Sequence, residues 1–213
     1  MAVTLKKGEG VSLKKQEHDL SIVTIGLGWD VKEKKTGFLK SLFGKNEEEY
    51  DLDVIAFLCD ASGKIANCGE VRNGSPSLLN GDIVFYNSMR HPSGNVWLTG
   101  DNRTGEGDGD DEQIILKLNA LGNEYQKIVF IVQIYDGKRR QQQFGEVANA
   151  FIRAVDANDK EMVRFNLSNN PSFDQKYSMV FAELVREADG WKFKAIGNPS
   201  IADSFVTHIE SYL

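Results

Sequence analysis

The stretch Lys127–Tyr135, which reads Lys-Ile-Val-Phe-Ile-Val-Gln-Ile-Tyr, decides the fold class of this chain. It is a nearly continuous run of β-branched and aromatic residues, which is typical of a strand that is buried on both faces. We therefore expect it to be a central strand that anchors the core. A second stretch, Leu52–Cys59, places its even-numbered residues on one apolar face and is expected to be another core strand.

Outward from these two stretches, short apolar runs alternate with clusters of Gly, Asn and Asp, a pattern that predicts antiparallel strands and turns. The further strands that we expect are Ser21–Leu27, Ile83–Tyr86, Val96–Leu98, Gln113–Asn119, Ala150–Val155, Met162–Leu167, Ser178–Arg186 and Trp191–Ile196. The last four should form two hairpins, through Asp156–Lys160 and through Asp189-Gly190.

Helical patterns are confined to Gln143–Asn149 and to Pro199–Tyr212, where Ile201, Phe205 and Ile209 recur at helical spacing. The sequence thus predicts an all-β fold: a β-sandwich of mostly antiparallel strands with a short C-terminal helix. At 213 residues and 41% apolar content, we expect residues 1–213 to form a single domain with a sizeable core.

Charge and apolar runs limit the possible partners and the location of the protein. The formal net charge is −6 and no segment is strongly basic, so nucleic acid is not expected as a partner. Because no apolar run has the length of a membrane-spanning helix or of a signal peptide core, we expect a cytoplasmic protein. Cys59 and Cys68 match no metal or redox spacing, which predicts free thiols.

Two segments interrupt the pattern of strands. Lys32–Glu49 is expected to be a loop insertion, in which the apolar tip Phe38–Phe43 lies between charged ends. The loop is either mobile or packed on itself, or its tip contacts a membrane or a protein. Asn67–Asp82 is rich in Gly, Asn and Ser and is expected to be an ordinary long loop.

The segment Gly100–Glu112 concentrates acidic residues between two expected strands. It contains Asp101, Glu106, Asp108, Asp110, Asp111 and Glu112. Two carboxylates about 5 Å apart repel by about 3 kcal/mol at an effective dielectric near 20, so the folded segment needs a counter-ion. Calcium fits, since it accepts six to eight oxygen ligands in flexible geometry. The spacing does not match an EF-hand loop, because the sixth position is Glu106 where that loop needs glycine.

Further oxygen donors stand at the ends of expected strands. They are Asp30, Asp51, Asp53 and Asn87. Asp51 and Asp53 share one strand face, which points away from Leu52 and Val54. If that face ends near the acidic segment, two ions could share one site.

These motifs together resemble the TerD family of tellurium-resistance and stress proteins. The residues that carry the resemblance are Gly26-Leu27-Gly28-Trp29-Asp30, Asp51-Leu52-Asp53, Phe85-Tyr86-Asn87, Gly100–Glu112, Lys127–Phe130, Phe144-Gly145, Ala150–Arg153, Gly190–Phe193 and Ala195–Gly197. Nearly the whole chain is covered. The insertion at 32–49 and the long loop at 67–82 depart from shorter members of the family, and leave the subfamily and the choice of partner open.

The resemblance implies a bacterial cytoplasmic β-sandwich that binds calcium, two ions, within a stress system that also contains a membrane protein. Carried over by position, the implied ligands are Asp101, Glu106, Asp108, Asp110, Asp111 and Glu112, with Asp30, Asp51, Asp53 and Asn87 completing the shell. We expect Arg103 to hold loop carboxylates by bidentate hydrogen bonds and not to contact metal.

Three hypotheses of function follow. The leading one is a calcium-dependent binding module, without catalytic residues or a small-molecule substrate, whose partners are other proteins of the stress-resistance system or a membrane-associated complex. In the alternative, calcium is purely structural and the apolar loop at 38–43 docks on a membrane or a partner subunit. An enzyme is not expected, because neither a metal-dependent hydrolase nor a tellurite reductase finds its acid–base or thiol chemistry in the sequence.

Overall fold

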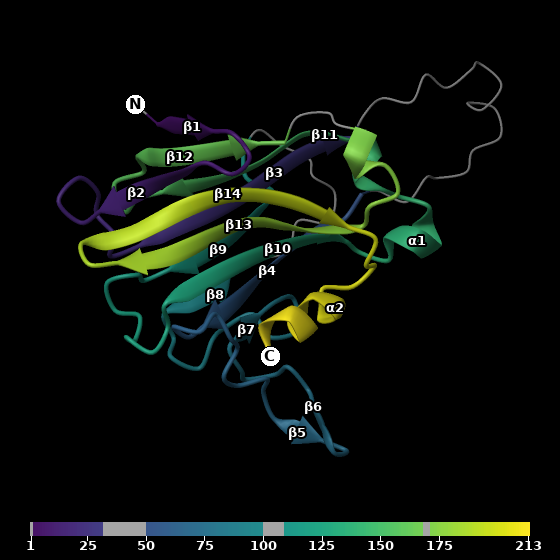
Figure 1. Ribbon diagram of the computed structural model, residues 1–213, viewed down its shortest axis with the longest axis horizontal. Helices are drawn as coiled ribbons and strands as arrows, with labels where there is room; N and C mark the ends of the chain where they lie inside the picture. Colours follow the sequence, from purple (N-terminus) through teal and green to yellow (C-terminus); the bar gives the residue numbers. More distant parts are fainter. Residues whose placement is uncertain (1, 32–49, 100–108, 168–170) are drawn as a thin grey trace.

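Two six-stranded sheets pack face to face in the computed structural model, which describes residues 2–31, 50–99, 109–167 and 171–213 (Figure 1). The first sheet has the order β1 (Val3–Leu5), β12 (Glu161–Asn166), β11 (Val147–Val155), β3 (Val23–Val31), β9 (Glu112–Leu116) and β8 (Val96–Leu98). The second has the order β2 (Gly10–Lys14), β14 (Gly190–Ser200), β13 (Ser178–Glu187), β10 (Lys127–Ile134), β4 (Leu52–Cys59) and β7 (Ile83–Val84). Within these sheets, neighbouring strands are antiparallel except β1 and β12. The predicted β-sandwich is confirmed.

The central position of β10 is also confirmed, since it pairs with β13 on one side and with β4 on the other. Its even-numbered residues, such as Phe130, lie in the core between the sheets. Val129 and Ile131 point the other way, into a second apolar cluster that contains Phe205 and Ile209 of the C-terminal segment. Both faces of β10 are therefore covered, which explains why its sequence lacks polar alternation.

The two expected hairpins, β11–β12 and β13–β14, are present. The helix predicted over Pro199–Tyr212 begins later, as α2 (Val206–Ile209) followed by the 3-10 turn Glu210–Tyr212. The prediction was wrong at its start because β14 continues to Ser200, which pairs with Ser178 of β13. Strand pairing overrides the helical spacing there.

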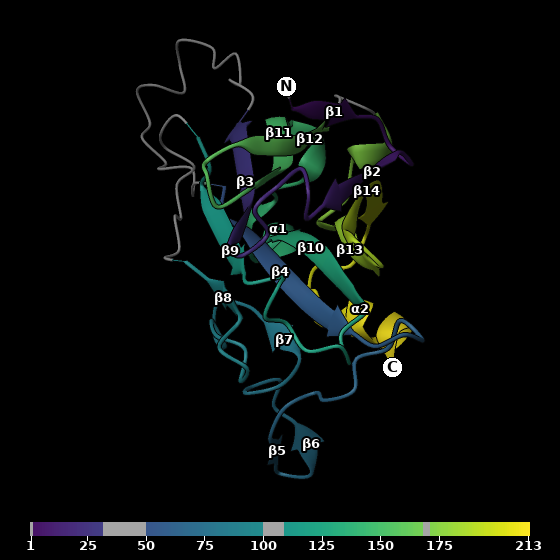
Figure 2. The same ribbon diagram turned by 90° about the vertical axis from the view of Figure 1, so that its left-hand side faces the viewer.

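Other short elements differ from the expectations. The pattern at Gln143–Asn149 gives only a 3-10 turn, Phe144–Glu146, before β11 begins, and a short helix α1 (Gly137–Arg140) precedes it. The segment Asn67–Asp82 is not a plain loop: it contains a hairpin of β5 (Val71–Arg72) and β6 (Ser75–Pro76) that projects from the sandwich (Figure 2). The N-terminal strands β1 and β2 were not predicted.

Several expectations fall outside the described residues. They are the Lys32–Glu49 insertion with its apolar tip, and the part of the acidic segment that holds Asp101, Arg103, Glu106 and Asp108. In the part of the chain that is described, no helix is long and apolar enough to cross a membrane.

Candidate metal centre

The described end of the acidic segment, from Gly109 onward, lies against the second half of β3. The backbone N–H of Asp111 donates to the carbonyl oxygen of Leu27 at 2.7 Å. The next residue, Glu112, begins β9 in register with Leu27. The carboxylates of Asp110, Asp111 and Glu112 are thereby fixed at one end of the first sheet.

Two glycines of β3 allow this close approach. A Cβ atom at Gly26 would lie 2.1 Å from the Asp110 carboxyl group. A Cβ at Gly28 would lie 2.4 Å from the Phe151 ring and 2.7 Å from the carbonyl oxygen of Gly109. Any side chain at either position would displace the acidic segment, so the spacing of Gly26 and Gly28 serves packing.

Asp110 is held by an arginine that the sequence analysis did not assign. Arg153 of β11 donates from Nε to Oδ1 at 2.7 Å and from Nη2 to Oδ2 at 3.1 Å. Its Nη1 donates to Glu161 at 3.0 Å. The bidentate contact with Asp110 is the main cause that raises the pKa of Arg153. Arg153 thus plays the role that we expected of Arg103, which the structure does not describe.

The next two carboxylates join the acidic segment to both sheets. Asp111 accepts a hydrogen bond from the backbone N–H of Trp29 in β3 at 2.9 Å. Glu112 accepts one from the backbone N–H of Val54 in β4, the opposite sheet, at 2.5 Å. Glu112 is 2% exposed and Asp111 is 8% exposed, so both hydrogen bonds are shielded from water. The conformation at the start of β9 is therefore coupled to the pairing of the two sheets.

Charge accumulates at this end of the first sheet. Burial raises the pKa of Asp111, and the neighbouring carboxylates of Asp30 and Asp110 raise it further, although the Trp29 N–H opposes them. Asp30 itself is exposed, and its Oδ2 accepts a hydrogen bond from the Asn149 side chain at 2.7 Å. Two of the predicted ligands, Asp30 and Asp110, are thus close enough to a third, Asp111, to repel its charged form.

The predicted ligands on β4 lie on a different face. Asp53 accepts a hydrogen bond from Gln133 at 2.9 Å, and Gln133 in turn accepts one from the backbone N–H of Phe205 at 2.7 Å. Asp53 therefore lies on the outer face of the second sheet, beneath the C-terminal segment. Asp51 lies 3.9 Å from Nη1 of Arg140. The prediction that Asp51 and Asp53 point away from the core side of β4 agrees with this arrangement.

Asn87 lines a cavity of about 560 Å³ between the Phe85–Asn87 segment and α2, together with Phe205 and Val206. This cavity lies on the same outer side as Asp53. Asp110 and Asp111, by contrast, are packed against β3 of the first sheet. The structure therefore places Asp111 near Asp30 and Asp110 at the first sheet, and places Asp53 and Asn87 on the outer side of the second sheet.

A metal site is not complete within residues 2–31, 50–99, 109–167 and 171–213, where no group of three or more His, Cys, Asp or Glu side chains is placed to hold an ion. Three of the predicted ligands, Asp101, Glu106 and Asp108, lie outside these ranges. The donor set that is described consists of carboxylate oxygens, which suits calcium. Calcium binding stays a prediction.

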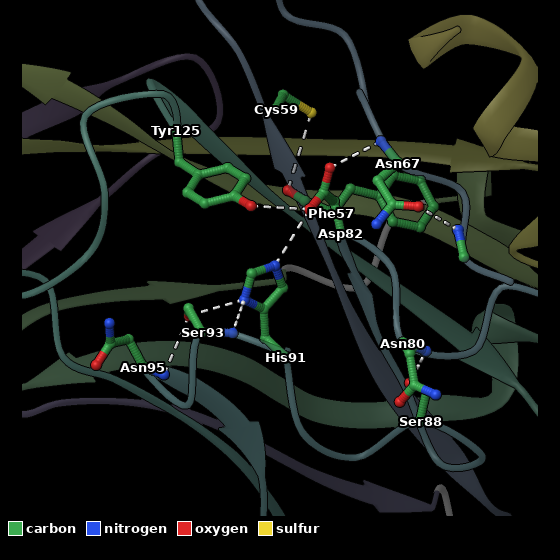
Figure 3. A network of polar contacts seen from close by, with 11 residues as sticks. Phe57, Cys59, Asn67, Asn80, Asp82, Ser88, His91, Ser93, Asn95 and Tyr125 are labelled. Carbon is green, nitrogen blue, oxygen red and sulfur yellow. Dashed lines mark hydrogen bonds and ion pairs between the residues drawn. The ribbon is translucent and has the colours of Figure 1, made fainter.

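A separate buried network surrounds Asp82, which the sequence analysis did not single out (Figure 3). Asp82 accepts hydrogen bonds from the Tyr125 hydroxyl at 2.9 Å and the Asn67 N–H at 2.8 Å, and contacts Nε2 of His91 at 3.2 Å. Because the Ser93 N–H donates to Nδ1 of His91, neutral His91 carries its proton on Nε2. Burial raises the pKa of Asp82, but these hydrogen bonds outweigh it and lower the pKa. The network fixes the long Asn67–Asp82 segment to the sandwich.

The two cysteines are free thiols, as predicted. Burial raises the pKa of Cys59 to about 12 and also raises that of Cys68. Since the thiolate is the nucleophile in thiol redox chemistry, neither side chain is activated at neutral pH.

The fold and the site define a class: a two-sheet β-sandwich in which a carboxylate-rich segment, seated on a glycine-bearing strand, is joined to both sheets. The model of the TerD domain matches residues 1–212, and this chain belongs to the TerD domain family. The resemblance found in the sequence is confirmed.

Relatives match over most of their length. The chain is 67% identical over 213 residues to the tellurium resistance protein TerX of Serratia marcescens, covering 100% of both chains. It is 40% identical to the tellurium resistance protein TerD of Alcaligenes sp, over 92% of this chain and 90% of that one. Among solved structures, a homologue of the telluride resistance protein (TerD) from Streptomyces coelicolor shares the fold, with a TM-score of 0.61 at 18% identity over 91% of this chain and 98% of that one.

Proposed function

We propose that this chain is a cytoplasmic, calcium-binding protein of a bacterial tellurite and chemical-stress resistance system, in which it acts as a metal-dependent binding module. Its relatives support the biological setting. They include the tellurium resistance protein TerX of Serratia marcescens and the stress response protein SCP2 of Bacillus subtilis, the latter 37% identical over 92% of each chain. The partners we propose are other proteins of the same system, one of them membrane-associated.

The observation that carries the calcium proposal is the crowding of Asp30, Asp110 and Asp111 at one end of the first sheet. Burial, and then the two neighbouring carboxylates, raise the pKa of Asp111, which means that its charged form is disfavoured there. Arg153 balances Asp110, and a divalent cation near Asp30 and Asp111 would relieve the remaining repulsion. Carboxylate oxygens are common calcium ligands, and these two would supply part of the six to eight oxygens that the ion takes.

In this proposal the ion supplies positive charge and oxygen coordination, and takes part in no bond-breaking step. The chain's own residues do the rest. Asp111 connects the acidic segment to Trp29 of β3, and Glu112 connects it to Val54 of β4. Ordering of the segment is therefore transmitted to both sheets, which gives a partner a surface that depends on calcium.

Isothermal titration of chelator-stripped protein with calcium tests the metal site, with magnesium as a parallel titrant. Asp111→Asn keeps an oxygen that can accept the Trp29 hydrogen bond but removes the charge, and should weaken calcium binding at least tenfold. Asp30→Asn should also weaken it. The matched control is Asp189→Asn, in the exposed turn between β13 and β14, which should bind like the wild type. Equal calcium affinity in all four proteins, or no binding by the wild type, would refute the proposed site.

Amide hydrogen exchange tests the binding-module part separately. Calcium should slow exchange in Gly109–Leu116 and in the facing half of β3, because ordered residues exchange more slowly. If calcium binds but exchange there is unchanged, the ion is not what orders the proposed surface.

A further inference from the structure

A second cavity lies at the edge of the first sheet that β1 forms, opposite to the β8 edge. There β1 and β12 meet β14 of the second sheet. Both views show these strands beside one another at the N-terminal edge of the sandwich (Figures 1 and 2). The cavity has a volume of about 460 Å³, within the range of small-ligand sites. It shares no lining residue with the candidate metal centre or with the cavity at Asn87.

The floor of this cavity is apolar. Leu5 and Phe165 are 6% and 3% exposed, and the partly buried Leu167 and Phe173 extend the floor outward. The side chain of Phe165 also packs in the core, where its ring centroid lies 5.6 Å from that of Phe181. An apolar chain placed here would lie on side chains that the fold already holds in position, so binding would require little reorganisation.

The rim carries positive charge. Lys6 and Lys7 line it, whereas none of the lining residues that the structure describes is acidic. The Nζ of Lys7 donates to the carbonyl oxygen of Gly197 at 3.0 Å, which holds the ammonium group at the cavity. Glu9 accepts a hydrogen bond from the backbone N–H of Lys6 at 2.8 Å, and not from its ammonium group. In the described chain, neither ammonium group forms an ion pair with a carboxylate.

A glycine opens the wall of the cavity on the β14 side. Gly197 has φ +59°, and a Cβ atom there would lie 3.0 Å from Cζ of Phe165 and 3.7 Å from Leu167. A side chain would therefore fill space above the apolar floor. Glycine here permits the left-handed backbone conformation and keeps the volume beside the carbonyl oxygen that Lys7 contacts.

We propose that this cavity binds an anionic amphiphile, a molecule with an unbranched hydrocarbon chain and a carboxylate head. The chain would lie on Leu5, Phe165 and Leu167, and the head would meet Lys6 and Lys7. In a protein with a formal net charge of −6, two ammonium groups beside an apolar floor favour a negatively charged ligand at this place. The site is independent of calcium and of the proposed function.

The test is isothermal titration of the full chain with dodecanoate, below its micelle concentration and in the presence of a chelator so that calcium plays no part. Octanoate and dodecyltrimethylammonium are titrated in parallel. Dodecanoate should bind, octanoate should bind far more weakly because each buried methylene contributes about fourfold in affinity, and the cationic amphiphile should not bind.

Variants of the protein test the contributions of the ligand's carboxylate head and of its hydrocarbon chain separately. Lys6→Gln combined with Lys7→Gln should weaken dodecanoate binding about five- to tenfold. The matched control, Lys14→Gln with Lys15→Gln, removes two exposed lysines at the end of β2 that do not line the cavity, and should bind like the wild type. Leu167→Asp should abolish binding, with an unchanged melting temperature as evidence that the edge of the sandwich still folds.

Vesicles of phosphatidylglycerol distinguish a free amphiphile from a lipid surface. In the expected case the protein does not bind such vesicles, with or without dodecanoate. Vesicle binding without dodecanoate binding would overturn the proposal, since a charged surface and not the cavity would then be the site. Equal dodecanoate affinity in the two double variants, or equal binding of the cationic amphiphile, would overturn it as well.

Discussion

Replacing Arg153 by methionine should destabilise the protein by about 2–3 kcal/mol, because it leaves the Asp110 carboxylate without its main counter-charge. The Asp110 side chain is 2% exposed and accepts from Arg153 at 2.7 and 3.1 Å. Removing one partner of a buried ion pair typically costs about 3–5 kcal/mol. We place this case below that range because the Arg153 side chain is 27% exposed, so water already reaches part of the guanidinium group.

Urea denaturation in chelator measures the effect, in a double-mutant cycle of Arg153→Met and Asp110→Asn. The coupling free energy should be about 2 kcal/mol. In a thermal melt, the Arg153→Met variant should lose roughly 4–12 °C, since about 1 kcal/mol corresponds to roughly 2–4 °C in a domain of this size.

The control is Glu161→Gln, which removes the other carboxylate that Arg153 contacts. The Glu161 side chain is 25% exposed, so its pair with Arg153 should contribute only about 0–1 kcal/mol. A coupling free energy below about 0.5 kcal/mol between Arg153 and Asp110 would refute the reasoning. It would show that Arg153 does not anchor the acidic segment.

Three further results are expected. Gly28→Ala should lower the free energy of unfolding by about 1–3 kcal/mol in urea titrations, because its Cβ would lie 2.7 Å from the backbone oxygen of Gly109. An unchanged midpoint of the urea transition would show that the acidic segment can move away. Burial lowers the pKa of His208, whose ring contacts the Ser178 hydroxyl at 2.8 Å, so the unfolded chain binds the His208 proton more strongly than the folded chain. The contribution of His208 to stability is full above pH 6.5 and should be lost as the pH falls below it, and His208→Gln should lose less stability over the same range. Parallel profiles of unfolding free energy against pH for the two proteins would contradict this. Cys59, whose pKa is raised to about 12, should resist iodoacetamide at pH 8 until the protein is unfolded, as followed by mass spectrometry; rapid labelling of the native protein would contradict its burial.

The fold could be predicted where local pattern and tertiary environment agree. Lys127–Tyr135 lacks alternation because β10 is covered on both faces, by the first sheet and by the C-terminal segment. The pattern failed at Pro199–Tyr212, where the spacing of Ile201, Phe205 and Ile209 predicted a helix from its start. Pairing of β14 with β13 up to Ser200 supplies backbone hydrogen bonds that a one-chain pattern does not reveal. The edge strand β2 was missed because it is short and carries one fully buried side chain, Leu13.

The candidate site was predictable in residue type but not in contact. Crowded carboxylates and the glycines at 26 and 28 are visible in the sequence, and the structure places Asp110 against Gly26. Arg103 was expected to hold the carboxylates of the acidic segment, and it lies outside the described residues. Arg153, which makes the contact, is 43 residues away and adjacent only because β11 pairs with β3. Proximity in the sequence is a poor guide to ion pairs in a sandwich whose neighbouring strands are far apart in the chain.

The same strand pairings connect the acidic segment to the C-terminal helix. β9 pairs with β3 and β8 in the first sheet, while Glu112 at its first residue reaches the backbone of β4 in the second. β4 carries Asp53, which leads through Gln133 to the backbone of Phe205, just before α2. Three buried hydrogen bonds therefore connect the acidic segment, the second sheet and the C-terminal helix. Since a buried polar group that loses its partner costs about 1–3 kcal/mol, a change at Glu112 should be felt at the C-terminus, and not only at the first sheet on which the acidic segment lies.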